Sequence, residues 1–328
     1  MATIPTTFKA FEFASYGDVL QEAKLNTQVK QQTLKPTQVR VKVVSAAVNP
    51  LDYKLLLFGA SFLPMAPTAD NPFRMGFDTA GIVVEVGSGD VRGFKVGDAV
   101  YGTPDITAGG SFGEYFPIDT KYLAHKPSNL TFNEAAGVPM AGLTSYQALN
   151  NLGQLQAGQR VLILGGSSAT GQFAIQIAKA RGAEVITTAS PRNIELVRSL
   201  GADQVVEYTS EKWGTVLAEH SVDLIYDCGV EPESWATDAQ KVLKKNSGKF
   251  VTIGMGPKPI ESPIGATFHQ LFLHPTPEDL QSLTTLVEAG QVKPTIDSVH
   301  PFEKVVDAIK LQMSNRAQGK IIIEVSSE

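Results

Sequence analysis

Residues 161–172 of the chain, Val-Leu-Ile-Leu-Gly-Gly-Ser-Ser-Ala-Thr-Gly-Gln, decide the fold. The first four form a short apolar run, typical of a buried strand, and a turn of small residues follows them. Gly171 to Arg181 then place apolar side chains at helical spacing, with Gly182 at the position of a C-terminal cap. The segment therefore predicts a strand, a tight turn and a helix.

This arrangement suits a dinucleotide, because small residues let the backbone approach a pyrophosphate and a helix N-terminus supplies free N–H groups. Aligned on Gly171, the turn departs from the pattern G-x-G-x-x-G, since Ser168 replaces the middle glycine. Small residues in such turns can also serve packing alone. Within a strand–helix–strand unit we favour a cofactor loop, whose backbone N–H groups would bind the pyrophosphate at Ser168, Ala169, Thr170 and Gly171.

The two parts of the chain differ in pattern. From Phe8 to about Asn129, short β-rich runs alternate with glycine and proline, which predicts a mostly antiparallel β domain. After about Leu130, strands alternate with helices, which favours a doubly wound parallel sheet. The last strand, 320–325, comes too late for that sheet, so we expect it to return to the first domain. We predict an α/β fold with segments 1–129, 130–275 and 276–328, the third returning to the first.

Composition excludes several classes of function. Lys and Arg number 28 against 33 Asp and Glu, a formal charge of −5, so we expect no nucleic-acid partner. The longest bare apolar stretch, Leu55–Phe58, is far below the roughly 18 residues of a membrane span. No signal segment is visible at the start, which favours a cytoplasmic protein and leaves organellar import open. The single cysteine, Cys228, cannot form an internal disulfide, and we interpret it as a small buried residue near the cofactor.

The end of the second strand of this sheet indicates which cofactor binds. An NAD site normally has Asp or Glu there, to accept a hydrogen bond from the ribose 2′-hydroxyl. Here the chain runs Thr-Thr-Ala-Ser-Pro-Arg-Asn over 187–193, with no acidic residue before Glu195. Hydroxyl, amide and guanidinium groups can donate to a phosphate, although a solvated Arg at a helix start is common. We therefore predict NADPH, with a 2′-phosphate pocket formed by Ser190, Arg192, Asn193 and Tyr208, the last alternatively being a plain strand-end aromatic.

Several segments, in order along nearly the whole chain, resemble the medium-chain dehydrogenase/reductase superfamily in its zinc-free quinone oxidoreductase branch. They include VNPLDYK at 48–54, GFDTAG at 76–81, GDAVYG at 97–102, GGSFGEY at 109–115, GLTSYQAL at 142–149 and GKII at 319–322. Residues 192–195 and 296–301 are similar to plant-type quinone oxidoreductase homologues and enone reductases. The resemblance implies a GroES-like catalytic domain split around a Rossmann domain, with substrate and nicotinamide between them, and a homodimer.

The resemblance also implies a site without zinc. Asn49 lies where zinc-dependent members have their first ligand, and Phe77 replaces their histidine. His269 and His274 are five residues apart, which does not place them on one helical face. Without a Lewis acid, simple ketones are hard to polarise, whereas quinones and carbon–carbon double bonds conjugated to a carbonyl accept a hydride readily. We therefore expect a small hydrophobic electrophile as the substrate.

By resemblance, Asn49 and Thr144 lie near the nicotinamide and its ribose, with a helix cap as the alternative for Thr144. Ile253 and Gly254 lie under the nicotinamide, and Arg316 reaches the cofactor or is a solvated loop residue. Tyr53 and Lys54 are the candidate proton donors near Asn49, and either could bond the oxygen of the substrate. Alternatively, Tyr53 is a wall of the substrate pocket and solvent delivers the proton. The apolar segment 55–62, with Met65, caps the substrate cleft or is a plain core helix.

The leading hypothesis is an NADPH-dependent, zinc-independent oxidoreductase acting on quinones or on the C=C bond of α,β-unsaturated carbonyls. Two alternatives stay open. One is a non-catalytic NADPH-binding or sensor protein, because a fold does not determine a function. The other is a zinc alcohol dehydrogenase, which would carry bound metal.

Overall fold

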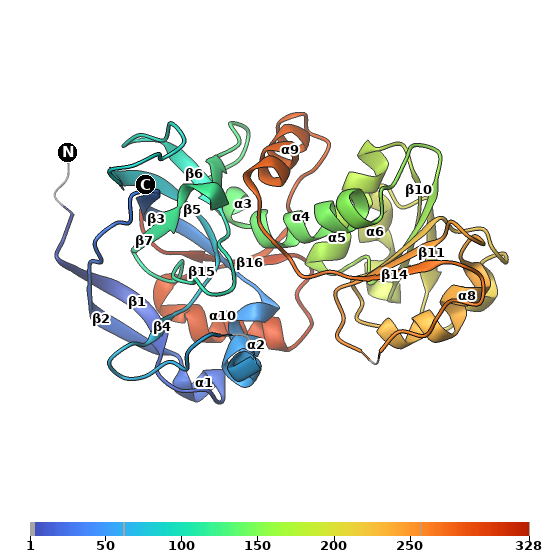
Figure 1. The fold of residues 1–328 in the computed structure, drawn as a ribbon, viewed down its shortest axis with the longest axis horizontal. Coiled ribbons are helices and arrows are strands. Elements are labelled where there is room, and N and C mark those ends of the chain that lie inside the picture. Colours follow the sequence, from blue (N-terminus) through green and yellow to red (C-terminus); the bar gives the residue numbers. More distant parts are fainter. Residues whose placement is uncertain (1–3, 62, 257, 328) are drawn as a thin grey trace. The chain divides into compact units, whose positions relative to one another are not determined.

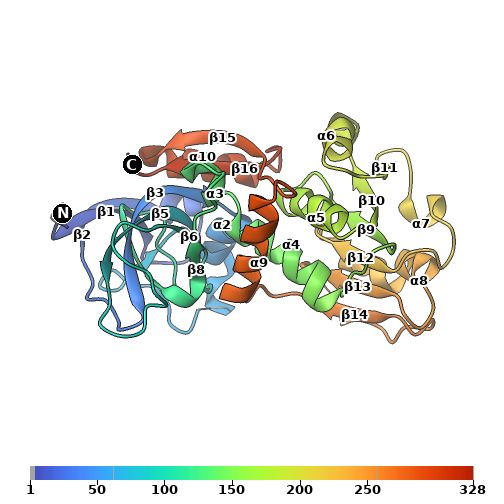
Figure 2. The same ribbon diagram turned by 90° about the horizontal axis from the view of Figure 1, so that it is seen from above.

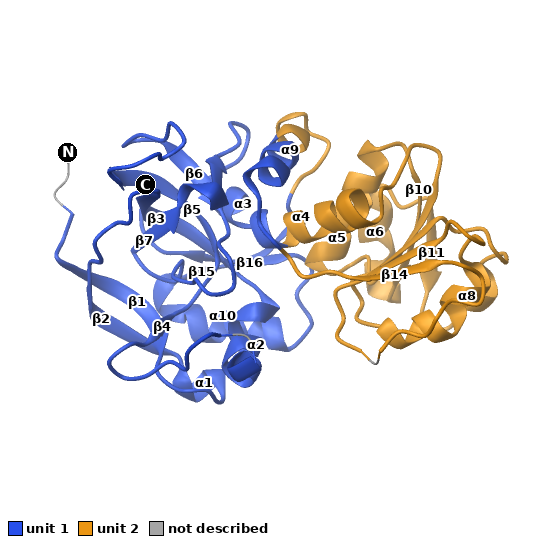
Figure 3. Ribbon diagram, in the orientation of Figure 1, with its two compact units in different colours: residues 1–140, 274–284, 294–328 blue, residues 141–273, 285–293 orange. Residues whose placement is uncertain are grey.

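The computed structural model describes residues 4–61, 63–256 and 258–327. The chain divides into two compact units, coloured separately in Figure 3. Unit 1 comprises residues 1–140, 274–284 and 294–328, and unit 2 comprises residues 141–273 and 285–293. Each unit has its own sheet and its own buried core, so they are described in turn.

Unit 2 is built on a six-stranded sheet in which every neighbouring pair is parallel (Figure 1). The strand order is β11-β10-β9-β12-β13-β14. This is the doubly wound Rossmann order, in which the chain starts at the centre of the sheet and builds outward in two halves. Its strands are β9 (Arg160–Leu164), β10 (Glu184–Ala189), β11 (Gln204–Glu207), β12 (Leu224–Asp227), β13 (Lys249–Thr252) and β14 (Thr267–Gln270).

Helices connect the successive strands from β9 to β13, as the alternating pattern predicts. α5 (Ala169–Ala180) follows β9 directly, and its buried residues include Phe173, Ile177 and Ala178. Gly182 has φ +77°, so the predicted glycine after the helix is confirmed. The other helical segments are α4 (Pro139–Tyr146), the π-helix η3 (Gln147–Leu152), α6 (Ile194–Ser199), α7 (Trp213–Val216) and α8 (Asp238–Val242).

Unit 1 contains a seven-stranded sheet, of order β15-β16-β3-β5-β6-β8 with β7 also pairing with β3, and a three-stranded sheet of order β2-β1-β4. All pairs are antiparallel except β15 with β16, which fits the predicted mostly antiparallel domain. The strands are β1 (Thr7–Phe13), β2 (Lys24–Lys30), β3 (Gln38–Val48), β4 (Phe73–Arg74), β5 (Asp78–Val86), β6 (Ala99–Gly102), β7 (Tyr115–Asp119), β8 (Leu123–His125), β15 (Ile296–Pro301) and β16 (Lys320–Glu324).

The helices of unit 1 are short, and several of them lie along the sheets in Figures 1 and 2. They are α1 (Val19–Glu22), α2 (Pro50–Phe58), α3 (Phe132–Ala136) and α10 (Val305–Met313), while α9 (Pro277–Glu288) crosses the boundary between the units. Short 3-10 helices join elements in both units. Unit 1 has η1 (Gly59–Ser61), η2 (Thr120–Tyr122) and η6 (Phe302–Lys304), and unit 2 has η4 (Pro191–Asn193) and η5 (Pro232–Ala236).

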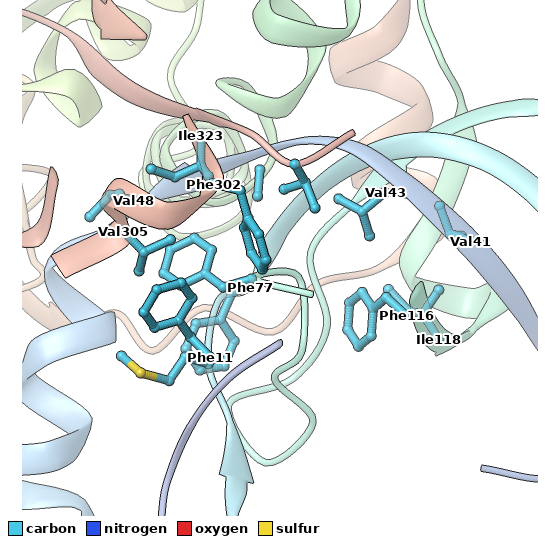
Figure 4. Packing of buried hydrophobic residues seen from close by; sticks show 14 of the residues in the cluster. Phe11, Val41, Val43, Val48, Phe77, Phe116, Ile118, Phe302, Val305 and Ile323 are labelled. Atoms are coloured by element: carbon cyan, nitrogen blue, oxygen red, sulfur yellow. The ribbon is translucent and has the colours of Figure 1, made fainter. Parts of the chain in front are cut away.

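The return of the last strand to the first domain is confirmed. β16 pairs antiparallel with β3, and Ile321 stands opposite Val48. Figure 4 shows the resulting core, in which Ile323 and Phe302 from the end of the chain lie among apolar side chains of its first third, Phe11 and Phe77 included. Burial of this apolar surface stabilises the unit, since a fully buried side chain of this size contributes roughly 1.5–3 kcal/mol.

The unit boundaries differ from the predicted ones at three places, one of them only the two residues 274–275, which lie in unit 1. Residues 130–140 lie in unit 1, where α3 packs on the sheet of that unit. Residues 285–293 lie in unit 2, because Gln176 and Lys293 exchange hydrogen bonds of 2.9 and 3.0 Å between side chain and backbone. Both contacts join segments far apart in the sequence, which local patterns do not show.

Candidate functional site

The turn after β9 requires its glycines. A Cβ on Gly166 would lie 1.9 Å from Thr187 Oγ1, and one on Gly171 would lie 2.3 Å from the Gly165 carbonyl oxygen. Two backbone N–H groups of the turn donate to the next strand: Gly165 to Thr188 Oγ1 at 2.9 Å and Gly166 to the Thr188 carbonyl at 3.1 Å. The turn is therefore held in one shape, and its glycines are required because other protein atoms pack closely against the backbone.

The first turn of α5 has two kinds of N–H group. Ser168 is the N-cap, and its Oγ accepts from Gly171 N at 3.0 Å, while Ser168 N donates to the Gly165 carbonyl at 3.0 Å. Within the described ranges, the N–H groups of Ala169 and Thr170 make no hydrogen bond. Of the four residues predicted to bind pyrophosphate through backbone N–H groups, these two are the ones whose donors remain for a ligand.

At the predicted adenosine end of the site, the side chain of Asn193 bonds two protein hydroxyl groups. Asn193 is only 6% exposed, and its Nδ2 donates to Ser167 Oγ at 3.0 Å and to Ser190 Oγ at 3.2 Å. Because the amide supplies both hydrogens, each hydroxyl accepts one bond and keeps its own proton to donate elsewhere. Sequence reasoning missed Ser167, although it stands in the turn itself.

The other predicted adenosine residues lie around this group. Tyr208 follows β11, and its backbone N donates to the Ala189 carbonyl at 3.3 Å, one residue before Ser190. Its side chain is 57% exposed, and Arg192 is exposed as well. Arg192 and Tyr208 thus follow the ends of the neighbouring strands β10 and β11. No acidic residue lies between the end of β10 and Glu195.

A hydrogen-bonded pair marks the ends of β12 and β13, where the cofactor's other half is expected. Thr252 Oγ1 donates to Asp227 Oδ2 at 2.6 Å and accepts from Gly254 N at 2.8 Å. Burial raises the pKa of Asp227, while its bond from Thr252 acts in the opposite direction. Ile253 N donates to the Asp227 carbonyl at 3.1 Å, so Ile253 and Gly254 directly follow the strand end at Thr252.

Cys228 is buried next to the phosphate-loop turn. Its Sγ donates to the Leu164 carbonyl at 3.0 Å, and Ser168 Oγ lies 3.7 Å away. Burial raises the pKa of the thiol to about 12. A thiol in this state is a poor nucleophile, which agrees with its interpretation as a small packing residue.

A buried polar cluster in unit 1 lies at adjacent ends of β16, β3 and β5. Lys320 Nζ donates to Asn49 Oδ1 at 2.6 Å, to Asp78 Oδ2 at 3.1 Å and to the Val48 carbonyl at 3.2 Å. Asn49 Nδ2 donates to Asp78 Oδ2 at 3.0 Å and to the Ala47 carbonyl at 3.3 Å. The side chains of Lys320 and Asp78 are 3% and 0% exposed.

This cluster changes the predicted role of Asn49. Its side chain is buried, and both its amide nitrogen and its oxygen already bond inside the protein. Asn49 therefore holds protein groups together rather than presenting a free amide to a cofactor. Sequence reasoning missed Lys320 and Asp78; the only signal was a charged residue at the first position of each strand.

Asp52, in the first turn of α2, is fully buried beside the cluster. Its Oδ2 accepts from Asn49 N at 2.7 Å, and in the part of the chain described its Oδ1 has no hydrogen-bond partner. Burial and the neighbouring Asp78 raise the pKa of Asp52 from 3.8 to about 7, against the opposite influence of the Asn49 and Gly76 amides and of Lys320. Burial is the largest of these causes.

The same helix presents the predicted proton donors. Tyr53 is partly buried against the unit 1 core, which raises the pKa of its phenol, and Lys54 is exposed. Neither side chain hydrogen-bonds to any described residue. Leu55 and Leu56 are core residues, whereas Leu57, Phe58 and Met65 are 47%, 59% and 69% exposed. That these exposed residues cap a substrate cleft stays a prediction. Phe62 lies outside the described residues.

Thr144 and Arg316 complete the predicted set. Thr144 lies inside α4, so it is not a helix cap. The next residue, Ser145, donates from Oγ to the Thr170 carbonyl at 2.7 Å, which ties α4 to the first turn of α5. Arg316 is exposed in the loop before β16.

The residues at the zinc position do not fit a metal. Phe77 is 1% exposed and packs in the unit 1 core, and the oxygen of Asn49 is taken by an ammonium group. Over the described ranges, no three His, Cys, Asp or Glu side chains are grouped so as to hold a metal ion. The same ranges contain no helix with the length and apolar character required to cross a membrane.

A Rossmann sheet with a glycine-dependent turn, together with a β domain, is typical of nicotinamide-dependent oxidoreductases. Two family models agree: "Alcohol dehydrogenase GroES-like domain" matches residues 35–128 and "Zinc-binding dehydrogenase" matches residues 200–323. The chain belongs to the medium-chain dehydrogenase/reductase superfamily, and quinone oxidoreductases and enone or alkenal reductases are among its homologues.

Three relatives illustrate this. The 2-methylene-furan-3-one reductase of Solanum lycopersicum is 37% identical over 98% of this chain and 80% of its own. The chloroplastic NADPH-dependent alkenal/one oxidoreductase of Arabidopsis thaliana is 35% identical over 98% of this chain and 81% of its own. The solved structure of the quinone oxidoreductase from Coxiella burnetii matches with a TM-score of 0.82 at 28% identity, covering 97% of this chain and 99% of its own.

Proposed function

We propose that the protein is an NADPH-dependent reductase of quinones or of the C=C bond of α,β-unsaturated carbonyls. The observation that carries this proposal is the Asn193 amide, which donates to both Ser167 Oγ and Ser190 Oγ. Two hydroxyl groups with protons to donate, next to Arg192, form a neighbourhood for an acceptor-only dianion. The 2′-phosphate of NADPH is such a group, and its absence in NADH would leave these donors without a partner.

The acceptor class rests on relatives and on chemistry. Relatives of this chain are named for alkenal, enone-type and quinone substrates. The residues at the zinc position are Asn49, whose oxygen accepts from Lys320, and the buried Phe77, so neither supplies a ligand for a metal that could polarise a simple carbonyl. Quinones and enones are activated by their own conjugation. The exposed apolar side chains of Leu57, Phe58 and Met65 favour a hydrophobic acceptor.

The nicotinamide, when bound, supplies a hydride. The chain must orient the acceptor. As negative charge develops on the oxygen of the acceptor, the chain must also provide a hydrogen-bond donor to that oxygen and then a proton. We propose that Lys54, and secondarily Tyr53, serve that oxygen, because both lie on α2 with polar groups uncommitted among the described residues. In the proposed cofactor site, Ala169 and Thr170 bind the pyrophosphate, and Ile253, Gly254, Thr144 and Arg316 line the remainder.

An acceptor panel tests the whole proposal. NADPH and NADH oxidation would be followed side by side with a quinone, an alkenal and a cyclic enone. We expect kcat/KM for NADPH to exceed that for NADH by at least about 30-fold, roughly 2 kcal/mol. Tight NADPH binding without turnover of any acceptor would instead support a binding or sensor protein, and stoichiometric zinc in the purified protein would support the alcohol dehydrogenase alternative.

Two substitutions test the proton donor. Lys54→Met should lower kcat by about 10²-fold, the lower range for loss of a general acid, while Tyr53→Phe should change it much less. Equal turnover in wild type and Lys54→Met would exclude Lys54. Arg92→Met, at an exposed turn of unit 1, serves as a control for loss of a positive charge.

We also propose a homodimer and a cytoplasmic location. β14 is an edge strand of the unit 2 sheet, and Ile260 and Phe272, on either side of it in the sequence, are 47% and 54% exposed. Pairing of this edge with a second copy would bury such surface. Sedimentation equilibrium showing only monomer, or cell fractionation placing the protein in an organelle, would overturn the respective proposal.

A further inference from the structure

Lys320 occupies an unusual position for a lysine. Its ammonium group is almost wholly buried and uses its three hydrogens on Asn49 Oδ1, Asp78 Oδ2 and the Val48 carbonyl. Val48 and Asn49 lie at the end of β3, which neighbours β16 in the sheet, and Asp78 begins β5, which neighbours β3. An exposed lysine in an ion pair contributes little to stability, whereas a buried lysine with all its hydrogens bonded fixes the positions of the groups around it.

The place of this cation relative to α2 is also unusual. Asn49 is the N-cap residue of α2, and an asparagine there normally accepts a hydrogen bond from the first turn of the helix. Here its oxygen accepts from Lys320 at 2.6 Å. A positive charge near a helix N-terminus opposes the helix dipole, so the arrangement costs stability unless Asp78 compensates it. The capping box of α2 is kept beside this cation, because Asp52 Oδ2 accepts from Asn49 N at 2.7 Å.

We propose that Lys320 is a positioning residue of the reductase: by binding Asn49 and Asp78, it sets where α2 begins and thus where Tyr53 and Lys54 stand. This inference rests on the proposed function only in assigning those two side chains to the acceptor oxygen. Asn49 is the residue directly before the helix, and Asp52 in its first turn binds Asn49 N. Movement of Asn49 therefore moves the turn that carries both donors.

The chemistry of the two acceptor classes provides a selective readout. Hydride transfer to a quinone leaves a hydroquinone anion, in which an aromatic ring stabilises the oxygen charge. Hydride transfer to the β-carbon of an enone leaves an enolate, a stronger base that needs a donor at its oxygen more. A misplaced donor should therefore slow enone reduction much more than quinone reduction, while general damage to the protein would slow both.

The test uses variants that keep the charges balanced. Lys320→Met/Asp78→Asn removes both charges and retains an oxygen for Met140 N, which bonds Asp78 Oδ1 at 2.8 Å. Asn49→Ala leaves the ion pair in place and removes the link to α2, so it serves if the double variant does not fold. Lys42→Met is the matched control, because among the described residues the Lys42 ammonium group bonds only the Ser327 carbonyl, at 2.8 Å, away from α2.

We expect both test variants to lose at least 10-fold in kcat with an enone and less than 3-fold with a quinone. The KM for NADPH should stay unchanged, and Lys42→Met should behave like wild type. Hydrogen exchange of amides 51–55 should be at least 10-fold faster, with β1 and β2 unchanged. Equal losses on both acceptors, or unchanged exchange in α2, would overturn the inference. If wild type reduces neither acceptor, the proposed function fails, and the exchange rates alone decide the role of Lys320.

Discussion

Replacing Asp52 by asparagine should remove a pH dependence from the stability of unit 1. The pKa of Asp52 is raised from 3.8 to about 7, so the folded protein holds this proton more tightly than the unfolded chain does. Stability from this group is thus complete at low pH and is lost as the pH rises from about 4 to about 7. About 3 pKa units at 1.36 kcal/mol each give a cost of about 4 kcal/mol for the charged form.

The variant should escape that cost. An asparagine has no charge to bury, and its oxygen can still accept from Asn49 N, as Asp52 does at 2.7 Å. Urea unfolding followed by circular dichroism would compare wild type and Asp52→Asn at pH 5 and pH 8. Between these, the unfolding free energy of wild type should fall relative to the variant by about 2–3 kcal/mol. Asp90→Asn, at an exposed turn, is the control. A difference between wild type and variant that stays the same at both pH values would refute the reasoning.

Three further outcomes are expected. Gly166→Ala should weaken NADPH binding at least 10-fold, because its Cβ would lie 1.9 Å from Thr187 Oγ1; fluorescence titration measures this, and unchanged affinity would contradict the loop geometry. Asn193→Ala should weaken NADPH binding about 10-fold, the loss of about 1.4 kcal/mol of hydrogen bonding, with NADH affinity unchanged; calorimetry that finds equal losses for both would count against the 2′-phosphate site. Cys228 should react with maleimide at pH 7 at least 100-fold more slowly than free cysteine, since its pKa is about 12; rapid labelling of the folded protein would show that the thiol is not buried as described.

The parts of the fold that follow local rules were predictable. The apolar run, the small-residue turn and the helical spacing after it lie within twenty-two residues, from Val161 to Gly182, and each obeys a short-range preference. The return of β16 also followed from chain order alone, since a strand after the completed parallel sheet needs another sheet. Both predictions are confirmed by the pairing of β9 in its sheet and of β16 with β3.

The contacts that organise the site were not predictable, because they join residues far apart in the sequence. Lys320 lies 242 residues from Asp78 and 271 from Asn49, and no periodicity records such a pairing. Asn193 shows the same limit at shorter range: its residue type suggested a phosphate ligand, whereas its amide bonds two hydroxyl groups. Residue type indicates which bonds are possible, and only the fold selects among them.

The place of β16 has a consequence for how the protein is made. A ribosome releases residues 141–273, most of unit 2, before it synthesises Lys320, whereas the sheet of unit 1 lacks the strand between β3 and β15 until residues 320–324 have been made. Until then the nascent chain carries Asp78 and Asn49 without the cation that neutralises and binds them. A messenger truncated before codon 320 would therefore yield a chain whose second half can fold and whose first half cannot close, and such a product would be a target for degradation.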